Sequence, residues 1–387
     1  MDFIDEELKR LKDKNLYRVL RPVSTPQDHR IKIAGKSFIL LSSNNYLGLA
    51  NHKLIKKKSA EALIKYGTGA GASRLISGNI ELYDELEKTI SRFKRTESAL
   101  VFSSGYAANV GTISALASEK DTIFSDELNH ASIIDGCRLS GADIKVYPHS
   151  NADKLEWMVK KYRGRGKKFI ITDSIFSMDG DIAPLGEIKN IASKHGCILF
   201  VDDAHATGVL GKTGRGSSEL FRIDGRIDIY MGTLSKALGS AGGFICGKKE
   251  LIDFLINKSR SFIYSTGLPP SALAAGTAAI ELIEKDRSLR DKLLKNVEIL
   301  KAGLDSLGYD TMKSETQIIP VLMKSEELAI RAFNFLYENG IFVPAIRPPT
   351  VPPNMSRLRI TVMATHTMKE MEFVLDVFSK MRRAIRI

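Results

Sequence analysis

Short apolar runs alternate along the chain with longer segments whose apolar residues recur at helical spacing. From about residue 41, these runs predict strands at residues 99–103, 122–125, 144–147, 169–173, 198–202, 229–232 and 243–246. Amphipathic segments between most of them predict helices, for example at residues 107–117, 152–160 and 188–194. Strands that alternate with helices predict an α/β fold, with a large domain in which helices cover both faces of a mostly parallel central sheet.

The pattern changes on either side of this region. Before it, we expect a charged helix at residues 5–14 and a short hairpin around residues 31–40. Beyond Pro269 and Pro270, a smaller α+β part is predicted, with helices at 271–284, 290–307, 327–339 and 369–383 and strands at 317–323 and 356–363. We therefore expect an N-terminal segment (1–45), a large domain (46–275) and a smaller C-terminal domain (276–387).

The composition is typical of a globular protein, since 43% of the 387 residues are hydrophobic and 26% are charged. The longest uncharged stretch, residues 98–118, contains serines and an asparagine, which favours a buried strand and helix over a membrane span. The N-terminus lacks the apolar core of a secretory signal. Cys137, Cys197 and Cys246 lie far apart without a CxxC pair. These features predict a reduced, cytoplasmic protein that does not associate with membranes.

Basic residues exceed acidic residues, with 57 Lys and Arg against 45 Asp and Glu and a formal net charge of +12. The basic residues are scattered, and the aromatic residues (7%) show no RNA-recognition pattern, so we expect no nucleic-acid partner. A diffuse positive excess is better suited to small polyanionic substrates or to an acidic carrier protein. Charge alone does not decide between these partners.

Polar residues follow several of the predicted strands and could carry chemistry. The turn at residues 103–109 leads from a strand into a helix, whose free N–H groups could hold a phosphate. Asp202, Asp203 and His205 stand at the end of the strand predicted at residues 198–202, where α/β proteins bind ligands. Lys236 comes shortly after the following strand, among small residues, where a lowered amine pKa would favour Schiff-base chemistry.

Each of these features also has an ordinary structural explanation. A strand–helix turn favours Ser and Gly in any case, and a loop lysine is usually solvated. The Gly-rich segment 67–74 has neither a GxGxxG nor a P-loop motif, and no spaced His and Cys cluster completes a metal site. Together, however, the turn, His130, the Asp-x-x-His and the Thr-x-x-Lys segments are the set that pyridoxal 5'-phosphate (PLP) requires. An acid keeps the pyridine nitrogen protonated, a lysine carries the Schiff base, and several donors hold the phosphate.

The motifs that surround these residues resemble those of one enzyme family. The most specific are Asn44-Asn45-Tyr46-Leu47-Gly48, Phe176-Ser177-Met178-Asp179-Gly180, Val201-Asp202-Asp203-Ala204-His205 and Gly232-Thr233-Leu234-Ser235-Lys236-Ala237. From about Arg21 to its C-terminus, the chain is similar to the α-oxoamine synthases, which are fold-type I PLP-dependent transferases. The resemblance implies PLP as the cofactor. It also implies a homodimer, because the family builds its site at a dimer interface.

The resemblance implies a role for each matching residue. Lys236 would form the Schiff base and later act as a base, Asp202 would pair with the pyridine nitrogen, and His205 would hydrogen-bond the phenolic oxygen. Cofactor contacts are further implied for the ring-stacking, catalytic His130 and for Gly105, Tyr106, Ser177 and Thr233. Substrate contacts are implied for Arg21, Asn44, Ser73, His130, Thr350 and Arg359, of which Arg359 would grip the amino-acid carboxylate. No metal is expected.

The segment 345–352 resembles a branch of the family that condenses L-alanine with a pimeloyl thioester, carried by CoA or by a carrier protein. Ser73 stands where glycine-using relatives carry Thr. The smaller serine leaves room for the methyl group of alanine, which also favours L-alanine as the amino-acid substrate. The alternatives are a glycine-using relative of the 2-amino-3-ketobutyrate CoA ligase or 5-aminolevulinate synthase type, an aminotransferase on the same fold, and a basic binding protein without enzymatic activity.

Overall fold

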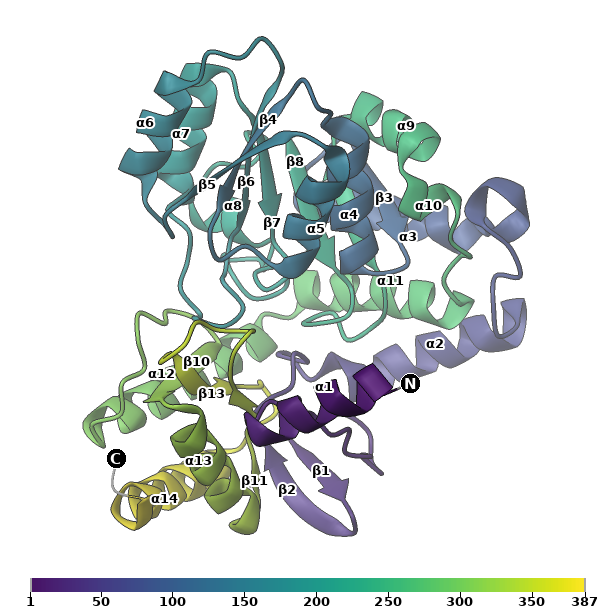
Figure 1. Cartoon of the computed structure of the whole chain (residues 1–387). Helices are drawn as coiled ribbons and strands as arrows, with labels where there is room; N and C mark the ends of the chain where they lie inside the picture. The colour runs from purple at the N-terminus through teal and green to yellow at the C-terminus, as the bar shows by residue number, and fades with distance from the viewer. Residues whose placement is uncertain (1, 386–387) are drawn as a thin grey trace. The chain divides into compact units, whose positions relative to one another are not determined.

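The computed structural model describes residues 2–385, which form two compact units (Figure 1). The large unit comprises residues 49–177 and 182–290. The small unit joins the N-terminal residues up to 48 with residues 178–181 and 291–385. Local sequence patterns do not display this grouping, because the N-terminal and C-terminal stretches are far apart along the chain. The domain boundaries expected from the sequence stay a prediction.

A mostly parallel sheet forms the centre of the large unit, as the sequence predicts. Its strands run in the order β3-β9-β8-β7-β6-β4-β5, and β9 is antiparallel to both of its neighbours. The bounds are β3 (Ser98–Phe102), β4 (Thr122–Asp126), β5 (Asp143–Tyr147), β6 (Lys168–Asp173), β7 (Ile198–Asp202), β8 (Ile229–Thr233) and β9 (Gly243–Gly247). The central strands β6, β7 and β8 are mostly apolar because helices cover both of their faces, and polar residues stand at the strand ends.

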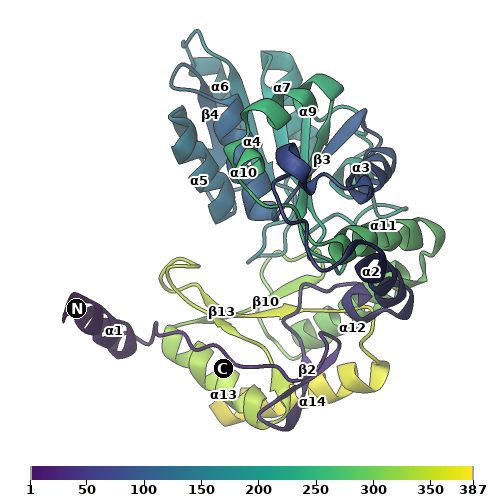
Figure 2. The same cartoon turned by 90° about the vertical axis from the view of Figure 1, so that its right-hand side faces the viewer.

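Helices pack on each face of this sheet. The bounds are α2 (Lys53–Tyr66), α3 (Glu81–Lys94), α4 (Gly105–Leu116), α5 (Ala131–Ser140), α6 (Ala152–Lys161), α7 (Leu185–His195), α8 (Ser217–Leu220), α9 (Lys249–Lys258), α10 (Arg260–Ile263) and α11 (Pro270–Lys285). Helices α4, α5, α9 and α10 lie together beside the sheet (Figure 2). They share one apolar cluster with alternate strand residues such as Phe200 and Met231. Because side chains alternate along a strand, Leu199 and Val201 face the other side, where α7 contacts β7.

The small unit contains two three-stranded sheets, in the orders β1-β2-β11 and β10-β13-β12. Its elements are α1 (Asp2–Asp13), β1 (Arg30–Ile33), β2 (Lys36–Leu40), β10 (Ile318–Lys324), α13 (Glu326–Glu338), β11 (Ile341–Phe342), β12 (Ala345–Ile346), β13 (Ser356–Thr361), α14 (Met368–Ile385) and most of α12 (Ser288–Ser306). The predicted hairpin is β1 and β2, which pair antiparallel. Strand β11 adds to β2 in parallel, and this two-residue strand is too short to show in the sequence pattern.

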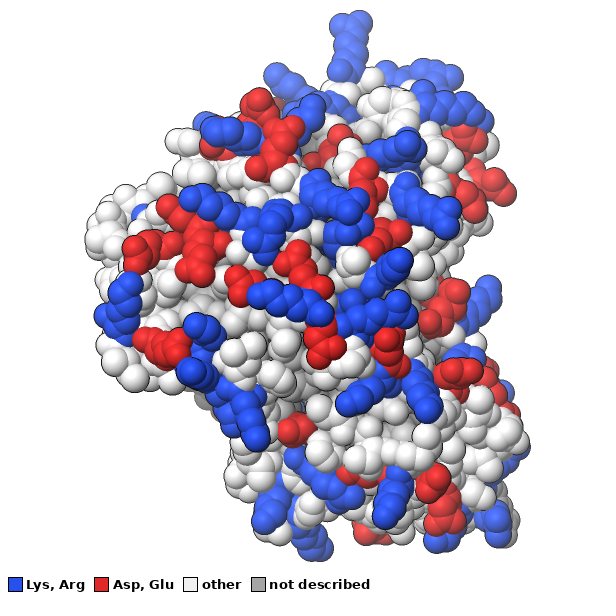
Figure 3. All heavy atoms as spheres, turned by 180° about the vertical axis from the view of Figure 1, so that it is seen from behind, with Lys and Arg blue, Asp and Glu red and all other residues white. Residues whose placement is uncertain are grey.

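Lysine and arginine side chains alternate with acidic side chains over the face drawn in Figure 3, without a large patch of one sign. This agrees with the scattered basic residues of the sequence. Among the helices of residues 2–385, none is long and apolar enough to cross a membrane.

Candidate active site

The predicted cofactor residues of the large unit gather at the carboxyl edge of its sheet. Asp202 ends β7 and Thr233 ends β8, and these two strands are adjacent. Because the strands are parallel, both residues lie at the same edge of the sheet. Lys236 follows β8 by three residues, and its Nζ lies 2.8 Å from Nε2 of His205. The structure therefore brings the predicted lysine into hydrogen-bonding distance of the predicted histidine.

The Asp202 carboxylate is buried and held by two neutral donors. Its Oδ2 accepts a hydrogen bond from Asn109 Nδ2 at 2.7 Å, and its Oδ1 accepts one from the Ala204 backbone N–H at 2.9 Å. These donors fix the orientation of the carboxylate without neutralising its charge. Such an arrangement leaves the charge available for a cationic partner in a site of low dielectric constant.

The next residue, Asp203, has a different environment. Its Oδ2 forms an ion pair with Lys94 Nζ at 2.7 Å, and both side chains are fully buried. The backbone N–H and the hydroxyl of Ser217 also donate to its Oδ1. Asp203 therefore stabilises the packing of α3 and of the loop before α8, whereas Asp202 carries no ion pair among the described residues.

His130 lies at the start of α5, where its Nδ1 accepts a hydrogen bond from the Ser132 backbone N–H at 3.2 Å. Its own backbone N–H donates to Asp173 Oδ2 at 2.7 Å. Burial lowers the pKa of His130, against the opposing effect of the Asp202 carboxylate. Burial, followed by repulsion from Asp202, raises the pKa of Asp173. The His130 ring is therefore neutral near pH 7, with its proton on Nε2.

The start of α4 approaches β8 closely, as a phosphate-binding turn requires. A Cβ at Gly105 would lie 2.8 Å from Cε of Met231, so only glycine fits here without a shift of that side chain. Ser104 caps the helix by accepting a hydrogen bond from the Ala107 N–H at 3.0 Å. Thr233 Oγ1 donates to the Gly242 carbonyl at 2.9 Å.

Two further predicted residues of the large unit are Tyr106, in the first turn of α4, and Ser73. The Tyr106 hydroxyl is hydrogen-bonded to Asp135. Ser73 precedes a short π-helical turn (Arg74–Gly78) and forms an isolated bridge with Thr266.

The remaining predicted residues belong to the small unit. Arg359 on β13 is buried, and its Nη2 lies 3.4 Å from Asn44 Oδ1. The Arg21 guanidinium lies over the Phe333 ring, 5.5 Å from its centroid. Thr350 Oγ1 accepts a hydrogen bond from a neighbouring arginine, Arg18, at 3.2 Å.

A hollow of about 900 Å³ in the small unit is rich in arginine. Arg18, Arg21 and Arg347 line it together with apolar residues of the N-terminal segment and α13. Burial, followed by repulsion from Arg18, lowers the pKa of Arg347. Two guanidinium groups that repel each other favour an anionic ligand.

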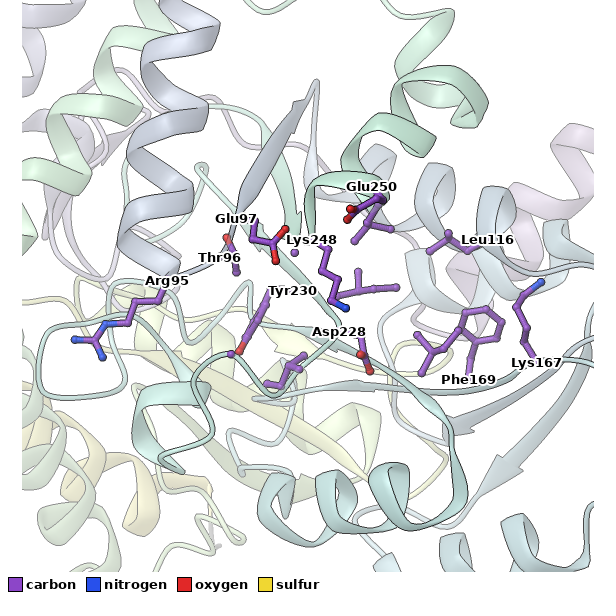
Figure 4. Close-up of a pocket in the computed structure, with 16 residues that line it drawn as sticks. Arg95, Thr96, Glu97, Leu116, Lys167, Phe169, Asp228, Tyr230, Lys248 and Glu250 are labelled. Atoms are coloured by element: carbon purple, nitrogen blue, oxygen red, sulfur yellow. The ribbon is translucent and has the colours of Figure 1, made fainter.

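A second hollow, of about 420 Å³, lies at the opposite edge of the large sheet (Figure 4). Its lining includes Phe169, Ile198 and Ile229, from the beginnings of β6, β7 and β8. None of the predicted site residues lines it. Because α/β sheets bind ligands at the carboxyl ends of their strands, this hollow is not the candidate active site.

Sequence reasoning assigned no role to Asn109 or Asp173, which hold Asp202 and His130 in place. Asn109 was visible as a polar residue within an apolar helix, but its partner lies on a distant strand. Across residues 2–385, no group of His, Cys, Asp or Glu has the geometry of a metal site.

The family model for aminotransferase class I and II matches residues 36–378. The chain belongs to this family. An 8-amino-7-oxononanoate synthase of Thermoanaerobacter pseudethanolicus is 49% identical over 100% of this chain and 98% of its own length.

Two solved structures share the fold of this chain. A structure of serine palmitoyltransferase (SPT) with its PLP internal aldimine has a TM-score of 0.94 and 32% identity, over 99% of this chain and 98% of that one. An 8-amino-7-oxononanoate synthase from Francisella tularensis has a TM-score of 0.78 and 31% identity, over 90% of this chain and 99% of that one. The predicted fold class is therefore confirmed.

Proposed function

We propose that this chain is a PLP-dependent 8-amino-7-oxononanoate synthase, an acyltransferase of biotin biosynthesis. The reaction joins the Cα of L-alanine to the acyl carbon of a pimeloyl thioester. The carbon–sulfur bond of the thioester breaks and releases the thiol, and the alanine carboxylate leaves as CO2. The full-length identity of 49% to a synthase of this name supports the assignment, together with the placement of Lys236, His205 and Asp202 at one edge of the sheet.

The residues of the large unit fit PLP. Among residues 2–385, the hydrogen bonds to the buried Asp202 carboxylate come from neutral donors, so it could hold a proton on the pyridine nitrogen of PLP. The start of α4, where Gly105 leaves no Cβ, offers its N–H groups to the phosphate together with Thr233. When bound, PLP supplies an electron sink for the negative charge that develops at Cα.

The protein's own groups then divide the remaining work. Lys236 Nζ, which lies 2.8 Å from His205 Nε2, would hold the cofactor and would take the Cα proton. His205 Nε2 would hydrogen-bond the phenolic oxygen of the cofactor with help from Ser177. The neutral ring of His130 would pack against the cofactor ring, and Tyr106 would contact the cofactor at the start of α4. In the small unit, Arg359 and Asn44 bind the alanine carboxylate.

The acyl donor ends in a second carboxylate, which needs a cationic or hydrogen-bonding partner when it is buried. The arginine-lined hollow of the small unit, with Arg21 and the nearby Thr350, suits this group. The net charge of +12 attracts the phosphates of CoA as well as an acidic carrier protein. We further propose that the active form is a cytoplasmic homodimer.

A product assay tests the assignment. Purified enzyme is supplied with L-alanine, glycine or L-serine and with pimeloyl-, succinyl-, acetyl- or palmitoyl-CoA, and both thiol and CO2 are measured. We expect equal release of thiol and CO2, highest with L-alanine and pimeloyl-CoA. Amino transfer without release of CO2 would identify an aminotransferase. Preference for glycine with acetyl or succinyl donors would identify a glycine-using relative. A colourless protein that binds no PLP would show that the chain is not a PLP-dependent enzyme.

A further inference from the structure

The loop that carries Ser177 begins and ends in the large unit, while its tip belongs to the small unit. At its base, Ile175 and Ile182 form an antiparallel bridge. The Ser174 backbone N–H donates to the Asp202 carbonyl at 2.9 Å. The base of this 174–183 loop is therefore tied to the strand end that carries Asp202.

The tip of the loop, residues 178–181, is packed against the beginning of β10. Gly180 has a φ of +72°, and a Cβ there would lie 2.0 Å from the Ile318 carbonyl oxygen. The Gly180 carbonyl accepts hydrogen bonds from Thr316 Oγ1 at 2.8 Å and from the Glu315 N–H at 3.1 Å. Both the left-handed backbone and the close approach require glycine at this position.

A buried arginine on β13 also holds the tip. Arg357 is only 1% exposed, and its Nη1 donates to Asp179 Oδ1 at 2.6 Å and to the Met178 carbonyl at 3.2 Å. Its Nε donates to the Met355 carbonyl at 2.9 Å. Burying a guanidinium is costly unless it is paired, so these contacts form a specific attachment rather than a chance surface ion pair.

The same strand carries the residue proposed to bind the amino-acid carboxylate. Arg357 and Arg359 are two positions apart on β13 and therefore lie on the same face of the strand, opposite Leu358 and Ile360. Asp179 is two residues from Ser177 along the loop. A single strand is thus connected both to the carboxylate-binding arginine and to the loop of Ser177.

We propose that Arg357 and Asp179 are positioning residues that link carboxylate binding at Arg359 to the placement of Ser177 beside the cofactor. The inference rests on the proposed function, since that function assigns the roles of Arg359 and Ser177. Neither Arg357 nor Asp179 touches the reacting atoms. They act by holding the tip of the loop on β13, so that Ser177 is set correctly when the amino acid is bound.

The test uses Asp179→Ala and Asp179→Asn in the holoenzyme, because Asp179 is partly exposed and its loss leaves the Arg357 contacts to two carbonyls in place. We expect Asp179→Ala to lower kcat/KM for L-alanine roughly tenfold to a hundredfold, as expected for a small misplacement of a reacting group. Asp179→Asn keeps an acceptor at the same position and should fall between Asp179→Ala and the wild type.

A spectroscopic measurement separates positioning from stability. Since Ser177 is assigned to the phenolic oxygen of PLP, the pH midpoint of the bound cofactor's absorbance should shift in Ser177→Ala and shift in the same direction in Asp179→Ala. In the Ser177→Ala background, Asp179→Ala should add little, because the two residues act in series. Asp376→Ala, which removes a surface ion pair with Lys380 in the same unit, is the matched control and should change neither quantity.

Additive effects of Asp179→Ala and Ser177→Ala would overturn the proposal. So would an unchanged absorbance midpoint in Asp179→Ala, with activity lost only in proportion to the melting temperature. The absorbance titration needs no acyl donor. Failure of the proposed function, seen as a wild-type enzyme that does not release thiol from pimeloyl-CoA, is therefore distinguished from failure of this inference.

Discussion

Asn109, in the second turn of α4, donates a hydrogen bond of 2.7 Å to the carboxylate of Asp202 at the end of β7. Its amide also donates to the Ser132 hydroxyl at 2.8 Å, so one side chain connects the helix, the strand and the start of α5. Asn109→Ala should leave Asp202 less well oriented and lower kcat roughly tenfold, the effect of about 1.5 kcal/mol from a hydrogen bond to a charged group. Steady-state kinetics measure this loss of kcat, with Ser114→Ala on the same helix as the control. Equal kcat values in the two variants would contradict the role of Asn109 in orienting Asp202.

Lys236→Ala should abolish turnover and the absorbance of lysine-bound PLP while the protein remains folded. The aldehyde carbon of the cofactor then has no amine to bond. Absorbance spectra and circular dichroism of the purified variant check both expectations. Lys248→Ala, which removes an exposed lysine at the opposite edge of the sheet, is the control and should behave as the wild type. Normal turnover in Lys236→Ala would show that the site is elsewhere.

The adjacent acids Asp202 and Asp203 should respond in opposite ways to the same substitution. Asp202→Asn should keep the melting temperature but lower kcat roughly a hundredfold or more, because the amide cannot hold the pyridine nitrogen protonated. Asp203→Asn leaves the buried Lys94 without its counter-charge and should cost about 3–5 kcal/mol of folding stability. The melting temperature and kcat of each variant test this prediction. Equal losses of kcat in both variants without a change in stability would contradict a catalytic role for Asp202 and a structural role for Asp203.

Ser73→Thr should reduce activity with L-alanine more than activity with glycine. The extra methyl group takes up space beside Cα that the alanine methyl needs, and one methyl group is worth about 1–3 kcal/mol in such a pocket. The ratio of kcat/KM for the two amino acids is the measurement. Ser91→Thr, on α3, is the control and should leave the ratio unchanged. A Ser73→Thr enzyme with the wild-type ratio would exclude Ser73 as the selecting residue.

His366 in the small unit should make the protein less stable as the pH falls. Burial lowers its pKa from 6.5 to about 4, against the opposing effect of Glu370, and its two ring nitrogens bond the Met363 N–H and the Leu40 carbonyl. The folded state keeps this ring neutral while the unfolded chain takes up a proton. The stability from His366 is therefore present above pH 6.5 and is lost toward pH 4, by up to about 3 kcal/mol.

Denaturant unfolding between pH 7 and pH 4 measures this contribution. His366→Gln should have a flatter dependence of the free energy of unfolding on pH than the wild type. Parallel curves for the two proteins would show that another group controls the acid sensitivity.

The local pattern of the sequence determined the elements and the chemistry. A strand of the large sheet is an apolar run of four to six consecutive residues, so it can be recognised without knowledge of its partners. These strands were predicted to within one residue at each end. The residue types at strand ends, an acid with a histidine and then a lysine, indicated PLP because that cofactor needs an acid and an amine in particular. These inferences require no knowledge of distant contacts.

The tertiary structure decided what depends on partners far apart in the chain. The sequence shows Asp202 and Asp203 as equivalent neighbours, and only the packing of α3 and α4 gives one of them Lys94 and the other Asn109. The strand order, the addition of β11 to β2 and the attachment of Asp179 to Arg357 have the same origin. Such contacts join segments separated by tens to hundreds of residues. The packing of the whole fold decides which segments meet, so no local periodicity or motif predicts these pairings.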